Sequence, residues 1–243
     1  MTDRGRVAVV TGAANGLGRT FAVALAGAGI RVAGIDVADQ RETAALVPGE
    51  FLAVTADVTH PAAMEAAVDA VVERFGALDI CVGNAGIYPM LSIDETTPEL
   101  WRRIMSINVD GAFHLVRAAL PHLRRGSEPR IVFIASAVVW LGPAHMAAYT
   151  ASKAALVGFT RALASELGPE GITVNAITPS MIATPTAVRT GVTRDLDRVV
   201  SGQAIPRAQR PEDLISTLLY LVDPASGFVT GSAINVDGGN AKH

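Results

Sequence analysis

Short runs of β-branched residues alternate with longer amphipathic segments along the whole chain. The run RVAVV at residues 6–10 predicts a buried strand, and residues 17–28 predict a helix with Phe21 and Leu25 on one face. Strands that are apolar on both faces are typical of parallel sheets covered by helices on both sides. The alternation therefore predicts an α/β fold: one domain over residues 1–243, built on a Rossmann-like, doubly wound parallel sheet of about seven strands.

The same pattern places the other elements. Further strands are expected at 30–35, 51–56, 78–82, 130–135, 172–177 and 233–236. Helices are expected at 40–46, 61–75, 98–124 (with a bend near 108–111), 148–167 and 211–221. Residues 179–207 show no clear period, and an irregular segment of that length is typical of a lid over a binding site. We therefore expect a substrate lid at about 179–207, the alternative being a surface insertion.

Composition argues against several classes of partner. The net charge of −3 and the lack of a basic run disfavour nucleic acid. The single cysteine, Cys81, lies in an apolar run and lacks the companions of a metal site. The longest apolar stretch, 131–143, is shorter than the roughly 18 residues of a membrane span, and the polar N-terminus is unlike a signal peptide. We expect a cytoplasmic protein without a metal, nucleic-acid or membrane partner.

Three glycines follow the first predicted strand, in the segment TGAANGLG at 11–18. They permit a sharp turn that brings backbone N–H groups close to a diphosphate, and the following helix N-terminus adds a favourable dipole. The spacing differs from the commoner Gly-x-Gly-x-x-Gly, and an ordinary strand-to-helix turn is the alternative. Its position between the first strand and first helix favours a dinucleotide site. The residues expected to contact the cofactor here are Gly12, Asn15, Gly16, Leu17 and Gly18.

Asp36 ends the second predicted strand, in the position from which a side chain reaches the adenosine ribose. A carboxylate there accepts hydrogen bonds from the ribose hydroxyls and repels a 2′-phosphate. No arginine or lysine lies within 13–15 or directly follows Asp36. The sequence therefore predicts NAD rather than NADP as the cofactor; the alternative is that Asp36 caps a helix.

Tyr149 and Lys153 form a Tyr-x-x-x-Lys pair on a predicted helix, where residues four apart share one face. A free tyrosine, with a pKa of about 10, is a poor base at neutral pH. We expect the nearby ammonium and a positive nicotinamide ring to lower the pKa of Tyr149. The phenol then serves as the acid or base for an alcohol or carbonyl oxygen. The same spacing also occurs as a solvated pair in ordinary helices.

Together with the glycine turn, this pair makes the chain resemble the short-chain dehydrogenase/reductase family over nearly its whole length. Asp57 and Val58, after the third strand, resemble the adenine contact of that family. The segment Asn84, Ala85 and Gly86 resembles its Asn-Asn-Ala-Gly signature, with Gly83 in place of the first asparagine. The resemblance implies a catalytic tetrad of Asn108, Ser136, Tyr149 and Lys153.

The resemblance also implies a role for each member. Tyr149 exchanges a proton with the substrate oxygen, and Ser136 hydrogen-bonds that oxygen. Lys153 holds the nicotinamide ribose, and Asn108 helps to hold a water that links Lys153 to solvent. After the sixth strand the family usually has Pro-Gly, whereas this chain has Ser180 in place of the glycine. The implied cofactor contacts in this second half of the chain are Tyr149, Lys153, Pro179, Ile182 and Thr184.

Within the family, the segments 84–89, 107–110, 176–180 and 203–207 are similar to the 1-phenylethanol dehydrogenase subgroup of secondary alcohol dehydrogenases. The expected pocket walls are apolar and aromatic, which suits a neutral, hydrophobic alcohol or ketone. We therefore expect an NAD-dependent alcohol dehydrogenase or ketone reductase for an aryl or bulky alkyl secondary alcohol. The alternative for single residues is packing beneath the lid. The expected pocket residues are Tyr88, Met90, Val138, Trp140, His145, Met181 and Pro185.

Two other functions remain open at this point. A 3-oxoacyl-thioester reductase has the same fold, but such enzymes generally use NADPH and basic residues, which Asp36 and the apolar pocket disfavour. A catalytically silent nucleotide-sensing protein would keep the fold but would usually lack part of the tetrad. Finally, the helices expected at 98–124 and 148–167 are apolar on more than one face. That pattern, with the resemblance, predicts a homotetramer.

Overall fold

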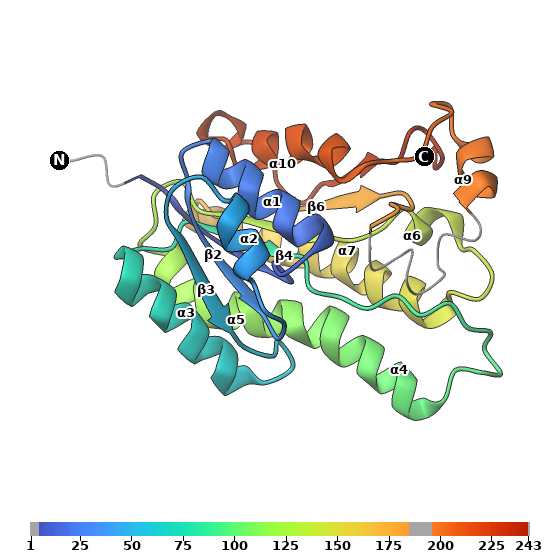
Figure 1. Ribbon diagram of the computed structural model, residues 1–243, viewed down its shortest axis with the longest axis horizontal. Coiled ribbons are helices and arrows are strands. Elements are labelled where there is room, and N and C mark those ends of the chain that lie inside the picture. The colour runs from blue at the N-terminus through green and yellow to red at the C-terminus, as the bar shows by residue number, and fades with distance from the viewer. Residues whose placement is uncertain (1–4, 185–195, 243) are drawn as a thin grey trace.

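Seven parallel strands form one sheet in the order β3-β2-β1-β4-β5-β6-β7 (Figure 1). The computed structural model describes residues 5–184 and 196–242. The strand order reverses between β1 and β4, so the loops that follow these strands diverge and leave a crevice at their carboxyl ends. The predicted doubly wound fold is confirmed. The strands are β1 (Val7–Thr11), β2 (Arg31–Asp36), β3 (Phe51–Thr55), β4 (Ile80–Gly83), β5 (Arg130–Ile134), β6 (Thr173–Pro179) and β7 (Ala233–Val236).

Helices cover both faces of the sheet, as the apolar strands require. One apolar core lies between the sheet and α3, α5 and α7, and the second lies between the sheet and α1 and α10. The helices are α1 (Gly16–Gly27), α2 (Arg41–Leu46), α3 (Pro61–Phe75), α4 (Pro98–Met105), α5 (Gly111–Leu123), α6 (Val138–Leu141), α7 (Ala147–Leu167), α9 (Leu196–Gly202) and α10 (Ile215–Val222). No helix of the described part of the chain is long and apolar enough to cross a bilayer.

The long helical segment predicted at 98–124 is divided in the middle. A π-helical turn, Ser106–Asp110, separates α4 from α5 and coincides with the bend expected there. Such turns are rare and often occur at functional sites. Here the turn carries Asn108, whose side chain is buried.

Two short helices were not expected from the sequence. Helix α6 is a single turn that ends at Gly142 in the left-handed conformation (φ 54°), and α9 lies within the segment expected to be an irregular lid. Segments this short do not complete enough turns to show a helical period. The central part of the expected lid, residues 185–195, lies outside the described residues.

Candidate active site

A cavity of about 590 Å³ opens at the carboxyl ends of the strands, where the order of the sheet reverses. Segments that follow all seven strands contribute to its wall, and α9 lies along one side. Most of the predicted cofactor contacts line it. These are Gly12, Asn15, Gly16, Leu17, Asp36, Asp57, Val58, Asn84, Ala85, Gly86, Tyr149, Lys153, Pro179, Ile182 and Thr184.

The glycine turn fits a diphosphate. Gly12 (φ 70°) and Gly16 (φ 52°) adopt backbone conformations that are strained for other residues. Helix α1 begins at Gly16 and has no acidic side chain in its first turn, so its unpaired N–H groups and dipole favour an anion. Gly18 does not line the cavity: a Cβ there would lie 2.0 Å from the carbonyl oxygen of Gly12, so Gly18 lets helix and turn pack closely.

Asp36 links the second strand to this turn. Its Oδ2 accepts a hydrogen bond from the N–H of Ala14 (2.9 Å), and its Oδ1 accepts one from Ala38 (2.9 Å). Arg19 donates to the carbonyl oxygen of the same Ala14 and forms an ion pair with Glu42 at 2.8 Å. The backbone N–H and carbonyl groups of Ala14 therefore both have side-chain partners, and Asp36 lines the cavity.

The end of β4 is tied to the same turn. The hydroxyl of Thr11 accepts hydrogen bonds from the N–H groups of Asn84 (3.0 Å) and Ala85 (3.1 Å), and the Asn84 amide donates to the Thr11 carbonyl (2.9 Å). A Cβ on Gly83 would lie 2.7 Å from the ring of Phe133. Phe133 therefore leaves no room for an asparagine side chain at Gly83, the position that departs from the family signature.

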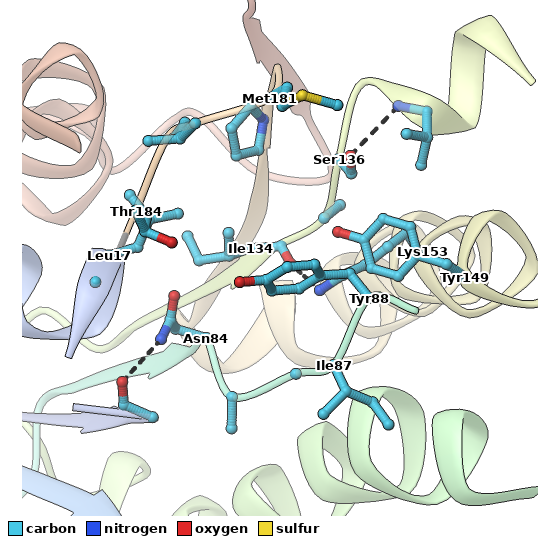
Figure 2. A pocket seen from close by; sticks show the side chains of 18 of the residues that line it. Leu17, Asn84, Ile87, Tyr88, Ile134, Ser136, Tyr149, Lys153, Met181 and Thr184 are labelled. Atoms are coloured by element: carbon cyan, nitrogen blue, oxygen red, sulfur yellow. Dashed lines mark hydrogen bonds between the residues drawn. The ribbon is translucent and has the colours of Figure 1, made fainter. Parts of the chain in front are cut away.

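Ser136, Tyr149 and Lys153 come together at the cavity wall (Figure 2). Lys153 Nζ donates a hydrogen bond to the carbonyl oxygen of Ile134 (2.7 Å) and lies 5.7 Å from the centre of the Tyr149 ring. The ring of Tyr88 packs edge-on against Tyr149, with 6.3 Å between centroids. Ser136 comes from the end of β5, and the other two from α7.

The pKa of Tyr149 is raised in the chain alone. Burial raises the pKa of Tyr149 to about 12, and the hydrogen bond with Ser136 only partly offsets this rise. Burial also lowers the pKa of Lys153 to about 8. In the chain alone the loss of water around the phenol outweighs the nearby ammonium. The expected lowering also counted a positive nicotinamide ring, so for the complex with the cofactor it stays a prediction. Tyr149 is therefore a protonated acid at neutral pH unless a ligand adds positive charge.

Asn108 lies behind the cavity and does not line it. Its amide donates to the carbonyl oxygen of Ile87 (2.9 Å) and to the hydroxyl of Ser152 (2.9 Å), and its Oδ1 accepts from the N–H of Ile87 (2.8 Å). These bonds hold the π-helical turn against the loop after β4 and against α7. The water-holding role implied by the family stays a prediction.

Some of the residues expected in the substrate wall line the cavity. Tyr88, Met90, Val138 and Met181 line the cavity, whereas Pro185 lies outside the described residues. Trp140 and His145 do not line it, and their placement there was wrong.

The reason lies in the single turn of α6. Val138 and Leu141, three residues apart, share the face toward the cavity, and Trp140 points elsewhere, donating from Nε1 to Asn235 Oδ1 at 2.8 Å. The backbone of His145 is left-handed (φ 63°), and its carbonyl oxygen accepts from Leu91.

Sequence patterns missed several residues of the wall. Some follow α6 directly and had no periodic signal, whereas others come from α4, from α9 and from the C-terminal end, far along the chain. The missed residues include Arg103, Leu141, Pro143, Ala144, Met146, Ser180, Arg198, Val199 and Asn240. Among the described residues no group of three His, Cys, Asp or Glu side chains is arranged to hold a metal.

The doubly wound sheet, the anion-binding turn and the Ser–Tyr–Lys set define an oxidoreductase that uses a nicotinamide cofactor. The chain belongs to the short-chain dehydrogenase/reductase family: a family model described as enoyl-(acyl carrier protein) reductase matches residues 12–241.

Three relatives illustrate the match. The short-chain reductase protein NovJ of Streptomyces niveus is 36% identical over 244 residues (96% of this chain, 93% of that protein). The (2S)-[(R)-hydroxy(phenyl)methyl]succinyl-CoA dehydrogenase subunit BbsD of Thauera aromatica is 36% identical over 250 residues (99% and 98%). The solved structure of a 3-ketoacyl-(acyl-carrier-protein) reductase from Brucella melitensis, complexed with NADH, superposes with a TM-score of 0.92 at 32% identity (99% and 100%).

Proposed function

We propose that the protein interconverts an aryl or bulky alkyl secondary alcohol and its ketone, with NAD(H) as the hydride carrier. The observation that supports this most directly is the pairing of Tyr149 and Ser136 at a cavity whose neighbouring wall is largely apolar. The apolar residues of that wall include Met90, Val138, Leu141, Met146 and Met181. Such a surface favours a hydrophobic ketone with few charges.

When bound, the nicotinamide supplies or accepts the hydride. In ketone reduction, Tyr149 gives its proton to the carbonyl oxygen, and a phenol with a pKa of about 12 holds that proton at neutral pH. The hydroxyl of Ser136 donates a hydrogen bond to the same oxygen and fixes its position. Lys153, anchored on Ile134, keeps a positive charge near the phenolate that forms.

The choice of NAD over NADP is supported by the charges around the end of β2. Asp36 lines the cavity, and so does the next residue, Val37, whose side chain is apolar. Arg19, the nearby cation on α1, is engaged by Glu42 and by Ala14. The carboxylate of Asp36 would therefore repel a 2′-phosphate, and Arg19 already has partners of its own.

A 3-oxoacyl-thioester reductase is the second candidate, favoured by the arginines Arg103 and Arg198 in the cavity wall. Since the Brucella reductase binds NADH, the cofactor does not separate the two activities. The name of the Thauera relative contains a hydroxy(phenyl)methyl group, which supports an aryl alcohol, and a succinyl-CoA thioester, which supports the second candidate.

A panel of acetophenones, aliphatic ketones and acetoacetyl-CoA, assayed with NADH and with NADPH, tests the proposal. We expect the highest kcat/KM for an aryl or bulky alkyl ketone with NADH. Activity confined to the thioester would overturn the ketone assignment, and a preference for NADPH would overturn the cofactor assignment.

We also propose a homotetramer. Trp101 on α4 and Phe113 on α5 expose 39% and 45% of their surface, which leaves aromatic side chains on the outer face of this helix layer. Light scattering coupled to size-exclusion chromatography tests the assembly; a monomer at micromolar concentration would contradict it.

A further inference from the structure

The C-terminal end of the chain returns to the cavity. Residues 237–241 follow β7, and the side chain of Asn240 is part of the cavity wall. Figure 1 shows this end of the chain beside α9. A Cβ on Gly202, the last residue of α9, would lie 2.9 Å from Asn240 Oδ1. Since Gly202 has no side chain, the amide of Asn240 fits against the helix.

Hydrogen bonds hold the backbone on both sides of Asn240. The buried carboxylate of Asp237 accepts from the N–H groups of Gly239 (2.9 Å) and Ala241 (2.7 Å). The amide of Asn235 donates to the carbonyl oxygen of Ala241 (3.2 Å). Asn240 is therefore presented from an anchored loop, so its amide loses little conformational freedom on binding a ligand.

This part of the cavity lies at the substrate end rather than the nucleotide end. Strand β7 is at the opposite edge of the sheet from β3, and β2 with Asp36 lies next to β3. Asn235 on β7 accepts the hydrogen bond of Trp140, on the α6 turn whose Val138 faces the cavity beyond Ser136. Asn240 consequently belongs to the wall opposite the adenosine side.

A second polar group of this wall has no partner within the described structure. The hydroxyl oxygen of Ser180 is buried and makes no hydrogen bond to a described residue, although its N–H donates to Gln209 Oε1 (2.8 Å). Ser180 lines the cavity, directly after Pro179 at the end of β6. A buried hydroxyl left without a partner destabilises the fold, and a ligand that accepts its hydrogen bond would offset that cost.

We propose that Asn240 and Ser180 donate hydrogen bonds to a second oxygen of the substrate, separate from the oxygen held by Ser136 and Tyr149. Both are neutral donors in an otherwise largely apolar wall, so the group they fit is a carbonyl oxygen. The substrate is then a hydrophobic ketone that carries a further carbonyl, such as an aryl diketone or a keto ester. This inference rests on the proposed function, whose substrate class it narrows.

A matched pair of ketones tests it: 1-phenyl-1,2-propanedione and propiophenone, which share a carbon skeleton. The measured quantity is the ratio of their kcat/KM values with NADH, in wild type, Asn240→Leu and Ser180→Ala. Since a neutral hydrogen bond contributes about 1 kcal/mol, we expect each variant to lower the dione-to-ketone ratio roughly fivefold. The exposed Lys242, in the same tail but not in the wall, gives the control Lys242→Ala, whose ratio stays at the wild-type value.

The stability of the variants separates binding from folding. Ser180→Ala removes a hydroxyl that bonds no described residue, so its melting temperature should equal or exceed that of wild type. A ratio that stays at the wild-type value in either variant overturns the inference while leaving the proposed function intact. If wild type reduces neither of these two ketones, the inference falls, and the proposed function falls with it if the aliphatic ketones of the panel are not reduced either.

Discussion

Lys153 Nζ donates a hydrogen bond to the carbonyl oxygen of Ile134 at 2.7 Å, and the ammonium is buried next to Tyr149. Burial lowers the pKa of Lys153 to about 8 because the surrounding protein solvates the charge less well than water does. The buried ammonium of Lys153 therefore lowers the free energy of unfolding at neutral pH. Such a cost is common where a charge serves catalysis.

Replacing Lys153 with methionine should stabilise the chain at neutral pH and abolish turnover. The folded-state pKa of about 8 lies below the ordinary value of 10.5, so between these values the unfolded chain binds more protons and wild-type stability rises with pH. We expect Lys153→Met to be more stable by about 2 kcal/mol at pH 7, allowing for the lost hydrogen bond. Urea unfolding, followed by circular dichroism, measures the difference.

That difference should shrink steadily from pH 8 and be small near pH 10.5, where the wild-type lysine is neutral in the folded state. Lys242→Met, at an exposed position, is the control and should leave stability nearly unchanged. If Lys153→Met is less stable than wild type at pH 7, the buried ammonium does not destabilise the folded chain.

Tyr149→Phe should lower kcat for ketone reduction by about a thousandfold, because the proton donor is lost while the ring remains. The dissociation constant for NADH, measured by fluorescence, should stay close to that of wild type. Tyr220, which is 49% exposed, supplies the control Tyr220→Phe with normal turnover. Wild-type kcat in Tyr149→Phe would rule out this phenol as the acid.

Asp36→Asn should raise the ratio of kcat/KM for NADPH to that for NADH by at least about fivefold, since it removes a negative charge that repels the 2′-phosphate. The substitution keeps an oxygen that accepts from Ala14. Asp39 lies in the same loop between β2 and α2 but does not line the cavity, so Asp39→Asn removes an equal charge and should change the ratio little. An equal change in both variants would mean that overall charge, not this carboxylate, sets the preference.

Replacing either of two glycines of α1, Gly18 or Gly27, with alanine should change stability in opposite directions. A Cβ on Gly18 would lie 2.0 Å from the Gly12 carbonyl oxygen, so Gly18→Ala should displace the turn, cost about 2 kcal/mol or more and weaken NADH binding. A Cβ on Gly27 would have no described atom within 4 Å, so Gly27→Ala should stabilise by about 0.5–1 kcal/mol with normal binding. Thermal unfolding with and without NADH compares them.

Much of the fold was predictable because it depends on local patterns. Helix α3 (Pro61–Phe75) and strand β7 (Ala233–Val236) lie at the expected residues, and most other boundaries shift by one or two. The helix expected from residue 211 begins instead at Ile215 as α10, after a 3-10 turn over Pro211–Leu214. The single turn α6 was missed, and with it the direction in which Trp140 points. A residue's face on one helical turn depends on where that turn begins, and the packing of Trp140 against Asn235 decides this.

The sequence by itself determined the alternation of strands and helices, the glycines of the phosphate turn, Asp36 at a strand end and the spacing of Tyr149 and Lys153. All of these depend on residues close together in the chain. Only the tertiary structure decided that burial raises the pKa of Tyr149, that Asn108 is committed to Ile87 and Ser152, and that Asn240 reaches the cavity. Burial and long-range contacts arise from segments that meet only when the chain folds.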